Sequence, residues 1–182
     1  EIEEEEGFDL NVEAPGTYYA YLYSDNALYT TIAYTYGADY TLPIPTRSGY
    51  TFEGWYDASD NRVYLVSSTD TGNKTYYARW HSNSNYLTKM NKSTGKWRKT
   101  WSKSRTSNVL TISRSKSSAK LKATISANAK VYVKYSGGSY NNITGKYKTV
   151  KVSKGKSKTL YFKVISQSGN SRTYKVVVKR SR

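Results

Sequence analysis

The sequence contains no cysteine in its 182 residues. Disulfide bridges, thiol catalysis and cysteine-based zinc sites are therefore all excluded. The single histidine, His81, falls in the stretch HSNSN, which we expect to be a loop between domains. A histidine-centred catalytic site therefore has no second histidine or thiol to act with. Apolar runs are far shorter than the roughly 18 residues that a membrane-spanning helix needs, so we expect no membrane span.

Carboxylates are missing from more than half of the chain. Residues 81–182 contain no Asp or Glu, although 25 of the 29 Lys and Arg residues lie there. All 13 acidic residues precede position 81 and are accompanied by four basic ones, so the two parts carry net charges of −9 and +25. Average usage would put about 12 acidic residues in the second part. This change predicts a domain boundary between a module at 17–81 and a basic domain at 86–182.

The missing carboxylates also exclude several kinds of site from the basic domain. A general acid/base pair of carboxylates, as in glycosidases, has no members there, and calcium has no acidic ligands. In the acidic part, Asp57, Asp60 and Asn61 could ligate a cation, but they lack the spacing of a calcium loop, and we interpret them as a polar hairpin loop. We therefore expect no enzyme, no metal and no cofactor.

The hydrophobic pattern predicts an all-β, β-rich chain. Tyr19, Tyr21 and Tyr23 alternate with other residues, the stretch SDNA then marks a turn, and a second alternating run follows at 28–36. Residues 1–16 precede these strands and are interpreted as an acidic linker, with an edge strand as the alternative. The basic domain shows about seven short alternating runs separated by glycine-containing turns, a pattern typical of a β-sandwich.

An ordered set of residues in the first part resembles the internalin B-repeat family, also called the Listeria–Bacteroides repeat. The resemblance covers about residues 17–80 and implies a small β-grasp-like module found on bacterial surface proteins, with Trp55 and Trp80 as large core residues. The residues that carry it are Tyr36, Gly37, Leu42, Pro43, Pro45, Gly49, Tyr50, Phe52, Gly54, Trp55, Tyr56, Thr75, Tyr77, Ala78 and Trp80.

The end of the chain resembles the cadherin-like, Ig-like β-sandwich domain of bacterial surface proteins, over about residues 86–182. The resemblance implies that Trp97 and Trp101, four residues apart, plug one end of the sandwich. The residues alone leave an alternative, in which Trp97 in the basic stretch GKWRKTWSKSR is an exposed stacking platform for a polyanion. The residues that carry the resemblance are Gly155, Leu160, Phe162, Val164, Ser168, Gly169, Asn170, Tyr174, Val176 and Val178.

The basic domain has one chemical property left to explain, which is its charge. Lysines that alternate with inward apolar residues, together with a loop cluster, should form a cationic surface that attracts polyanions in a salt-dependent way. The candidate polyanion-binding residues are Lys120, Lys122, Lys134, Lys151, Lys154, Lys156, Lys158, Lys163, Lys175 and Lys179, and the candidate stacking residue is Trp97.

These observations favour a non-catalytic module of a secreted or cell-wall-associated bacterial protein, Gram-positive by its cysteine-free, polar composition. We expect its partner to be an anionic cell-wall polymer such as teichoic acid, or a host glycan. Two alternatives remain at this point: a passive spacer that presents another domain of the parent protein, and a positive field that serves only solubility or docks onto the acidic part. A nucleic-acid ligand is permitted by the charge, but no nucleic-acid-binding motif supports it.

Overall fold

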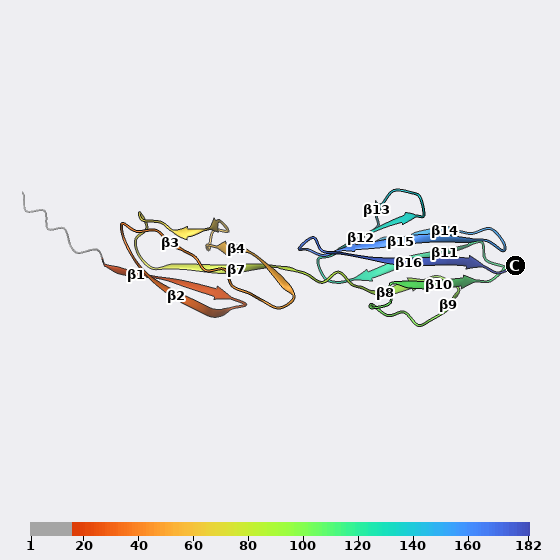
Figure 1. Cartoon of the computed structure of the whole chain (residues 1–182), viewed down its shortest axis with the longest axis horizontal. Helices are drawn as coiled ribbons and strands as arrows, with labels where there is room; N and C mark the ends of the chain where they lie inside the picture. The colour runs from red at the N-terminus through yellow and green to blue at the C-terminus, as the bar shows by residue number, and fades with distance from the viewer. Residues whose placement is uncertain (1–15) are drawn as a thin grey trace, which may run out of the picture. The chain divides into compact units, whose positions relative to one another are not determined.

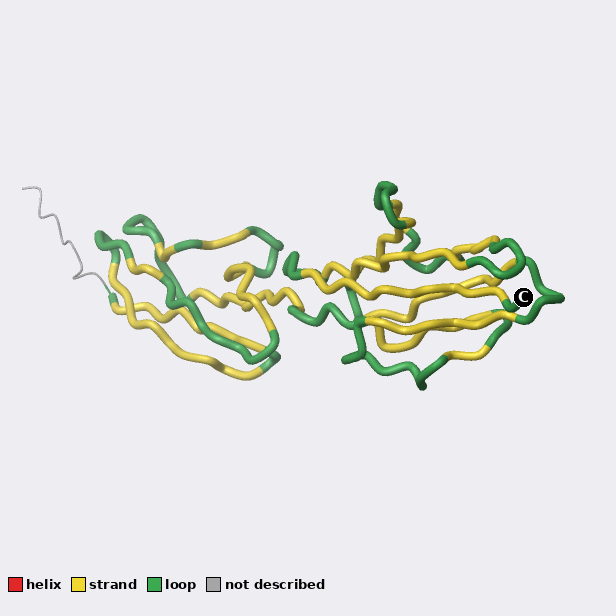
Figure 2. Tube along the Cα trace, turned by 45° about the vertical axis from the view of Figure 1, so that its right-hand side comes forward, coloured by secondary structure: helices red, strands yellow, loops and turns green. Residues whose placement is uncertain are grey.

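The computed structural model describes residues 16–182, and within them the chain forms sixteen β-strands and no helix (Figure 2). The all-β prediction is therefore confirmed. The interpretation of residues 1–16 as a linker or an edge strand falls almost wholly on residues 1–15, outside the described part. The described residues therefore include no helix that is long and apolar enough to cross a membrane.

The chain separates into two compact units (Figure 1). The described part of the first unit comprises residues 16–45 and 52–80, and the second comprises residues 46–51 and 81–182. The strands of the first unit are β1 (Thr17–Ser24), β2 (Ala27–Thr35), β3 (Tyr40–Thr41), β4 (Tyr50–Tyr56), β5 (Arg62–Val63), β6 (Leu65–Val66) and β7 (Lys74–Ser82).

A five-stranded mixed sheet with the order β2-β1-β7-β4-β5 forms the frame of the first unit. Strands β1 and β2 make the predicted hairpin, and its turn residues Asp25 and Asn26 have φ angles of 50° and 64°. Both residues tolerate positive φ, as a tight two-residue hairpin turn requires. Strand β1 also pairs in parallel with β7, so the two ends of the module meet in the centre of the sheet.

Aromatic rings supply most of the first unit's core. Trp55 is buried, and its indole N–H donates to the carbonyl of Pro43 at 2.7 Å. Phe52 lies between Trp55 and Trp80, with ring centroids 5.5 and 5.4 Å away, although Trp80 itself is only half-buried. The prediction of Trp55 and Trp80 as large core residues therefore holds fully for Trp55, whereas Trp80 lies towards the end of β7, at the margin of this core.

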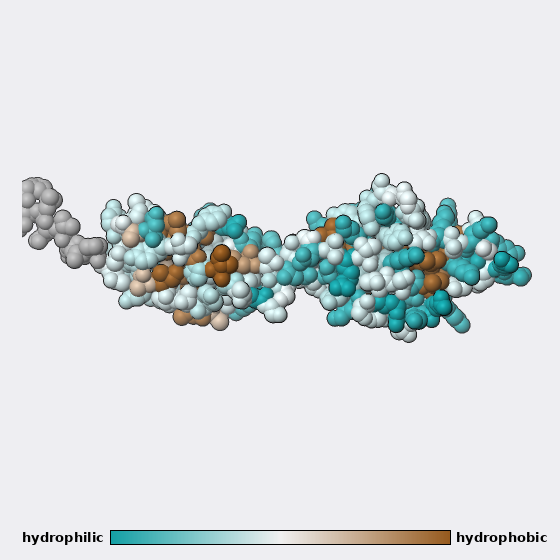
Figure 3. Space-filling model, viewed as in Figure 1, coloured by the Kyte–Doolittle hydropathy of each residue, from teal (hydrophilic) through white to brown (hydrophobic). Residues whose placement is uncertain are grey.

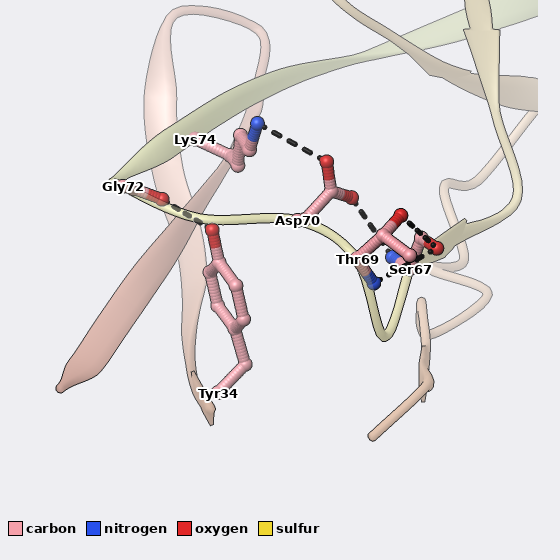
Figure 4. Close-up of polar contacts among 6 residues, drawn as sticks. All are labelled: Tyr34, Ser67, Thr69, Asp70, Gly72 and Lys74. Carbon is pink, nitrogen blue, oxygen red and sulfur yellow. Dashed lines mark hydrogen bonds and ion pairs between the residues drawn. The ribbon is translucent and has the colours of Figure 1, made fainter. Parts of the chain in front are cut away.

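The loop that precedes β7 is held by the polar contacts in Figure 4. The Tyr34 hydroxyl donates to the carbonyl of Gly72. Asp70 accepts a hydrogen bond from the backbone N–H of Ser67 at 2.8 Å and pairs with Lys74 at 3.2 Å. The buried Tyr34 thus ties this loop to β2, and the Asp70 carboxylate ties it to the start of β7.

His81 lies within β7, not in a loop as the sequence predicted. The strand continues to Ser82, and the backbone N–H of Asn83 then donates to the carbonyl of Gly49 at 2.9 Å. Strand-like pairing with the residues before β4 therefore extends through a stretch whose Ser and Asn content indicated a loop.

Nine strands form the second unit, two more than the alternation predicts. The two extra strands, β9 and β13, are two residues long, too short for alternation to reveal them. The strands are β8 (Leu87–Lys92), β9 (Lys96–Trp97), β10 (Ser107–Ile112), β11 (Ser118–Ile125), β12 (Lys130–Tyr135), β13 (Asn141–Asn142), β14 (Lys148–Lys151), β15 (Ser157–Ile165) and β16 (Ser171–Arg180).

These strands form a β-sandwich. One sheet has the order β13-β12-β15-β16-β10-β9 and the other has the order β14-β11-β8. Alternate residues of both sheets point into one contiguous apolar core, which includes Leu121 and Val150 from the smaller sheet and Leu110, Phe162 and Val176 from the larger. Because the period of a strand is two, the residues between these core positions face outward, and in this unit many of them are lysines.

Tyr174 links the two sheets at one end of the core. Its ring is fully buried, and its hydroxyl donates to the carbonyl of Lys103 at 2.6 Å and accepts from the backbone N–H of Leu87 at 3.1 Å. Burial raises the pKa of this phenol. The hydroxyl therefore joins β16 of the larger sheet to β8 of the smaller one and to the loop that follows β9.

We expect the substitution Tyr174→Phe to destabilise the second unit by about 1–3 kcal/mol, because it leaves buried backbone groups without their partner. Chemical denaturation followed by tryptophan fluorescence measures this change. Tyr132→Phe is the matched control, since it removes the hydroxyl of an outward-facing tyrosine and should change stability by less than about 0.5 kcal/mol. Equal effects of the two substitutions would contradict the linking role.

Tyr76 gives the first unit a distinct alkaline response. Burial, and then the charge of Asp70, raise the pKa of Tyr76 to about 12. The unfolded phenol ionises near pH 10. The unfolded state therefore loses its proton first as the pH rises, and stability that is complete below pH 10 declines between about pH 10 and 12. Tyr76→Phe should reduce this decline in denaturation experiments at pH 9 and pH 11, and an unchanged pH dependence would refute the assignment.

Candidate anion-binding surface

The structure distributes the ten predicted lysines over three places on the second unit. Four of them, Lys134, Lys163, Lys175 and Lys179, lie on strands of the larger sheet. Another group, Lys120, Lys122 and Lys151, lies on the smaller sheet. The last group, Lys154, Lys156 and Lys158, lies in the β14–β15 connection and the start of β15. The sequence thus predicts that the lysines lie on the second unit. It does not show that they divide between the two sheets of the sandwich and the end near the β14–β15 connection.

Charge dominates the surface of this unit. In the view of Figure 3, strongly hydrophilic side chains are denser over the second unit than over the first. No carboxylate exists in residues 81–182 to neutralise them. Fields between exposed charges extend over a Debye length of about 8 Å at physiological salt, so neighbouring lysines reinforce one another.

The end of the sandwich near the β14–β15 connection carries additional basic residues that sequence reasoning did not select. Arg180 is the most constrained of them, because its guanidinium donates to the carbonyls of Arg114 at 2.7 Å and Val152 at 3.2 Å. Lys151, Lys158 and Arg180 share a cavity of about 250 Å³. Because the guanidinium of Arg180 donates its hydrogen bonds to backbone carbonyls, its role at this end is structural. Lys151 and Lys158 are the residues of this cavity whose charge is available to a ligand.

The larger sheet presents lysines and tyrosines together. Lys134 of β12 lies opposite Tyr161 of β15, which lies opposite Lys175 of β16. In the neighbouring row Tyr132 lies opposite Lys163. All of these positions alternate with buried core residues, so they share the outer face. The tyrosines of this face were not predicted as site residues, although the alternation of VYVKY already placed Tyr132 beside Lys134 on the outside.

Trp97 and Trp101 pack against each other, with ring centroids 5.3 Å apart, and both are half-buried against the core. The Trp101 indole N–H donates to the carbonyl of Leu87 at 3.1 Å. The centroid of the Trp101 ring lies 6.0 Å from that of the Tyr174 ring. These contacts agree with the interpretation of Trp101 as a core plug. Part of each ring also lines a groove of about 450 Å³ with Lys89 and Met90, so a stacking role for Trp97 stays a prediction.

The Asp57 carboxylate, considered above as a cation ligand, is occupied by its own loop. It accepts hydrogen bonds from the backbone N–H groups of Ser59 and Asn61, each at 2.9 Å, and from the Asn61 side chain at 3.1 Å. The hydrogen bonds from Asn61 hold the pKa of Asp57 below its ordinary value. Asp60 pairs with Arg79. Within residues 16–182 no three acidic or histidine side chains gather as a metal site would require.

The structure therefore defines a two-unit, all-β chain whose second unit is a basic sandwich. Residues 23–79 match the family model of the Listeria-Bacteroides repeat domain. The match confirms the first of the two resemblances, and it covers most of the described first unit. This repeat family is found in bacterial surface proteins. The cadherin-like resemblance of residues 86–182 is not confirmed and stays a prediction, and no curated protein matches the chain.

Proposed function

We propose that this protein is a non-catalytic module of a secreted or cell-wall-associated bacterial protein, and that its second unit binds anionic polymers. The observation that carries the proposal is a folded sandwich with 25 basic residues and no carboxylate. Such a surface has no carboxylate in its own unit to neutralise it, and an external polyanion lowers the repulsion between its lysines. The Listeria-Bacteroides repeat beside it supports a location where teichoic acids and host glycans are the available polyanions.

The arrangement of the cations supports binding of an extended polymer better than binding of a small anion. The predicted lysines lie on strands and one connection, and most of them are exposed. A small anion is held by several converging donors in a pocket. The cavity at the β14–β15 end has lysines at its rim, but Arg180 directs its guanidinium to backbone carbonyls there. A polymer, in contrast, gains from many separate contacts along its length.

The proposal predicts salt-dependent binding. The full chain should bind heparin and a poly(glycerol phosphate) teichoic acid at 50 mM salt, and the affinity should fall about tenfold or more at 200 mM, because each neutralised charge releases counterions. Titration calorimetry at the two salt concentrations measures this fall, with uncharged dextran as the control polymer. A chain that binds neither polyanion at 50 mM salt is a passive spacer. Binding that does not weaken with salt would overturn the electrostatic basis of the proposal.

A further inference from the structure

One part of the basic surface combines charge with aromatic rings. We define the Lys–Tyr face as Lys134 and Tyr132 of β12, Tyr161 and Lys163 of β15, and Lys175 of β16, together with Tyr140 of the β12–β13 connection. Its cross-strand pairs alternate in kind: Lys134 with Tyr161, Tyr161 with Lys175, and Tyr132 with Lys163. The result is a checkered band of cations and rings across three adjacent strands.

The spacing of this band follows from the sheet. Directly opposed residues have Cβ atoms about 5 Å apart, and diagonal neighbours are about 7–8 Å apart. Lys134 and Lys175 are separated by one strand, which puts them roughly 10 Å apart. No carboxylate of this unit can neutralise these three ammonium groups, and all of them lie within about a Debye length of a neighbour. The band therefore combines three neighbouring positive charges with rings between them.

Tyr140 shows how the rings and the cations interact. The Lys134 ammonium lies 4.9 Å and the Lys163 ammonium 5.9 Å from the centre of the Tyr140 ring. Lys134 also lies 5.9 Å from the ring of Tyr161. The faces of aromatic rings carry partial negative charge, which attracts the ammonium groups and restrains the long lysine side chains on the sheet. The cations are thereby partly preorganised before any ligand arrives.

Other basic regions also bring cations and rings together, as at Tyr86 with Lys103 and Arg172, but none joins three rings to three of the predicted lysines. The end near the β14–β15 connection has many cations but one such ring, Tyr135, which lies 4.8 Å from the Lys148 ammonium and 5.4 Å from that of Lys158. The smaller sheet offers a single exposed ring, Tyr147, at 5.3 Å from Lys122. Only the larger sheet presents three outward or exposed rings interleaved with three lysines among the predicted cations.

We infer that the Lys–Tyr face binds an anionic polysaccharide, a polymer that has both sulfate or carboxylate groups and sugar rings. The lysines pair with the anionic groups, and the tyrosine rings lie against the C–H faces of the sugars, whose partial positive charge matches the negative face of the ring. The inference rests on the proposed function and narrows it to one face and one class of polymer.

A nucleic acid would also bring charge and flat rings, but the face suits it less well. All three cations of the band are lysines, whereas recognition of phosphate and of bases favours the planar guanidinium of arginine. The neighbouring surface repeat also indicates an extracellular location, where glycans are abundant. Single-stranded DNA therefore enters the test as the competing ligand.

The first experiment locates the site with two charge-matched variants of the full chain. The face variant carries Lys134→Gln, Lys163→Gln and Lys175→Gln, and the matched variant carries Lys120→Gln, Lys151→Gln and Lys154→Gln. Each loses three positive charges. We expect the affinity for dextran sulfate at 50 mM salt to fall about tenfold or more in the face variant and less than about threefold in the matched variant. Equal losses would overturn the choice of face and leave the proposed function standing.

The second experiment tests the rings. A variant with Tyr140→Thr and Tyr161→Thr removes two rings, and threonine suits the strand position of Tyr161. Its affinity for dextran sulfate should fall about tenfold, the size expected for loss of ring stacking. Its affinity for poly(vinyl sulfate), which has the charge but no sugar rings, should fall by less than about threefold, because only the positioning of the lysines by the rings is lost. Equal losses for the two polymers, or no loss for either, would overturn the stacking of sugars.

Two further measurements, thermal unfolding and binding of single-stranded DNA, distinguish loss of the binding site from misfolding and from nucleic-acid binding. Thermal unfolding midpoints within about 2 °C of the unaltered chain show that the variants are folded, and a variant outside this range is replaced by its single substitutions. Single-stranded DNA that binds tighter than dextran sulfate at equal salt, and that loses affinity in the tyrosine variant, would replace the glycan by a nucleic acid. If the unaltered chain binds none of the polymers, the proposed function itself fails.

Discussion

The uncompensated positive charge of the second unit is the constraint on which the rest of its structure depends. Twenty-five cations in a sequence segment without a carboxylate repel one another, and no salt bridge within the unit can relieve them. The sandwich offsets this cost with one continuous apolar core that both sheets share, from Leu87 and Leu121 to Phe162 and Val178. Burial of apolar surface does not depend on charge, so a core of this kind tolerates a surface that electrostatics alone would disfavour.

Aromatic rings on the surface of the second unit partly offset the repulsion between its lysines. Lysines in strands place their ammonium groups over neighbouring rings, as Lys134 does at Tyr140 and Lys148 does at Tyr135. These contacts stabilise a cation without an anion, because the ring supplies the negative charge. The high tyrosine content of the chain, 20 residues, thus serves different purposes in its two parts. In the first unit rings such as Tyr34 fill the core, whereas in the second several of them lie under ammonium groups.

The fold was largely predictable from the sequence because strands reveal themselves by alternation. Leu160, Phe162 and Val164 point inward exactly as their spacing predicts, and the turn at Asp25 and Asn26 forms where the sequence places it. The resemblance to the surface repeat was also sound over residues 23–79. Prediction failed where tertiary pairing overrides composition. His81 belongs to a strand because β7 continues past its polar residues, and β9 and β13 are too short to alternate.

The candidate site was harder to predict, since a sequence gives the direction of a side chain but not the strand beside it. Alternation placed Lys134, Lys163 and Lys175 on the outside, yet only the order β12-β15-β16 shows that they share one face, while Lys120 and Lys151 belong to the other sheet. These lysines contribute equally to the net charge, but the strand order places them on two different sheets. A polymer lying along one face contacts one set and not the other, so the topology turns a general positive charge into a surface with a specific place for a ligand.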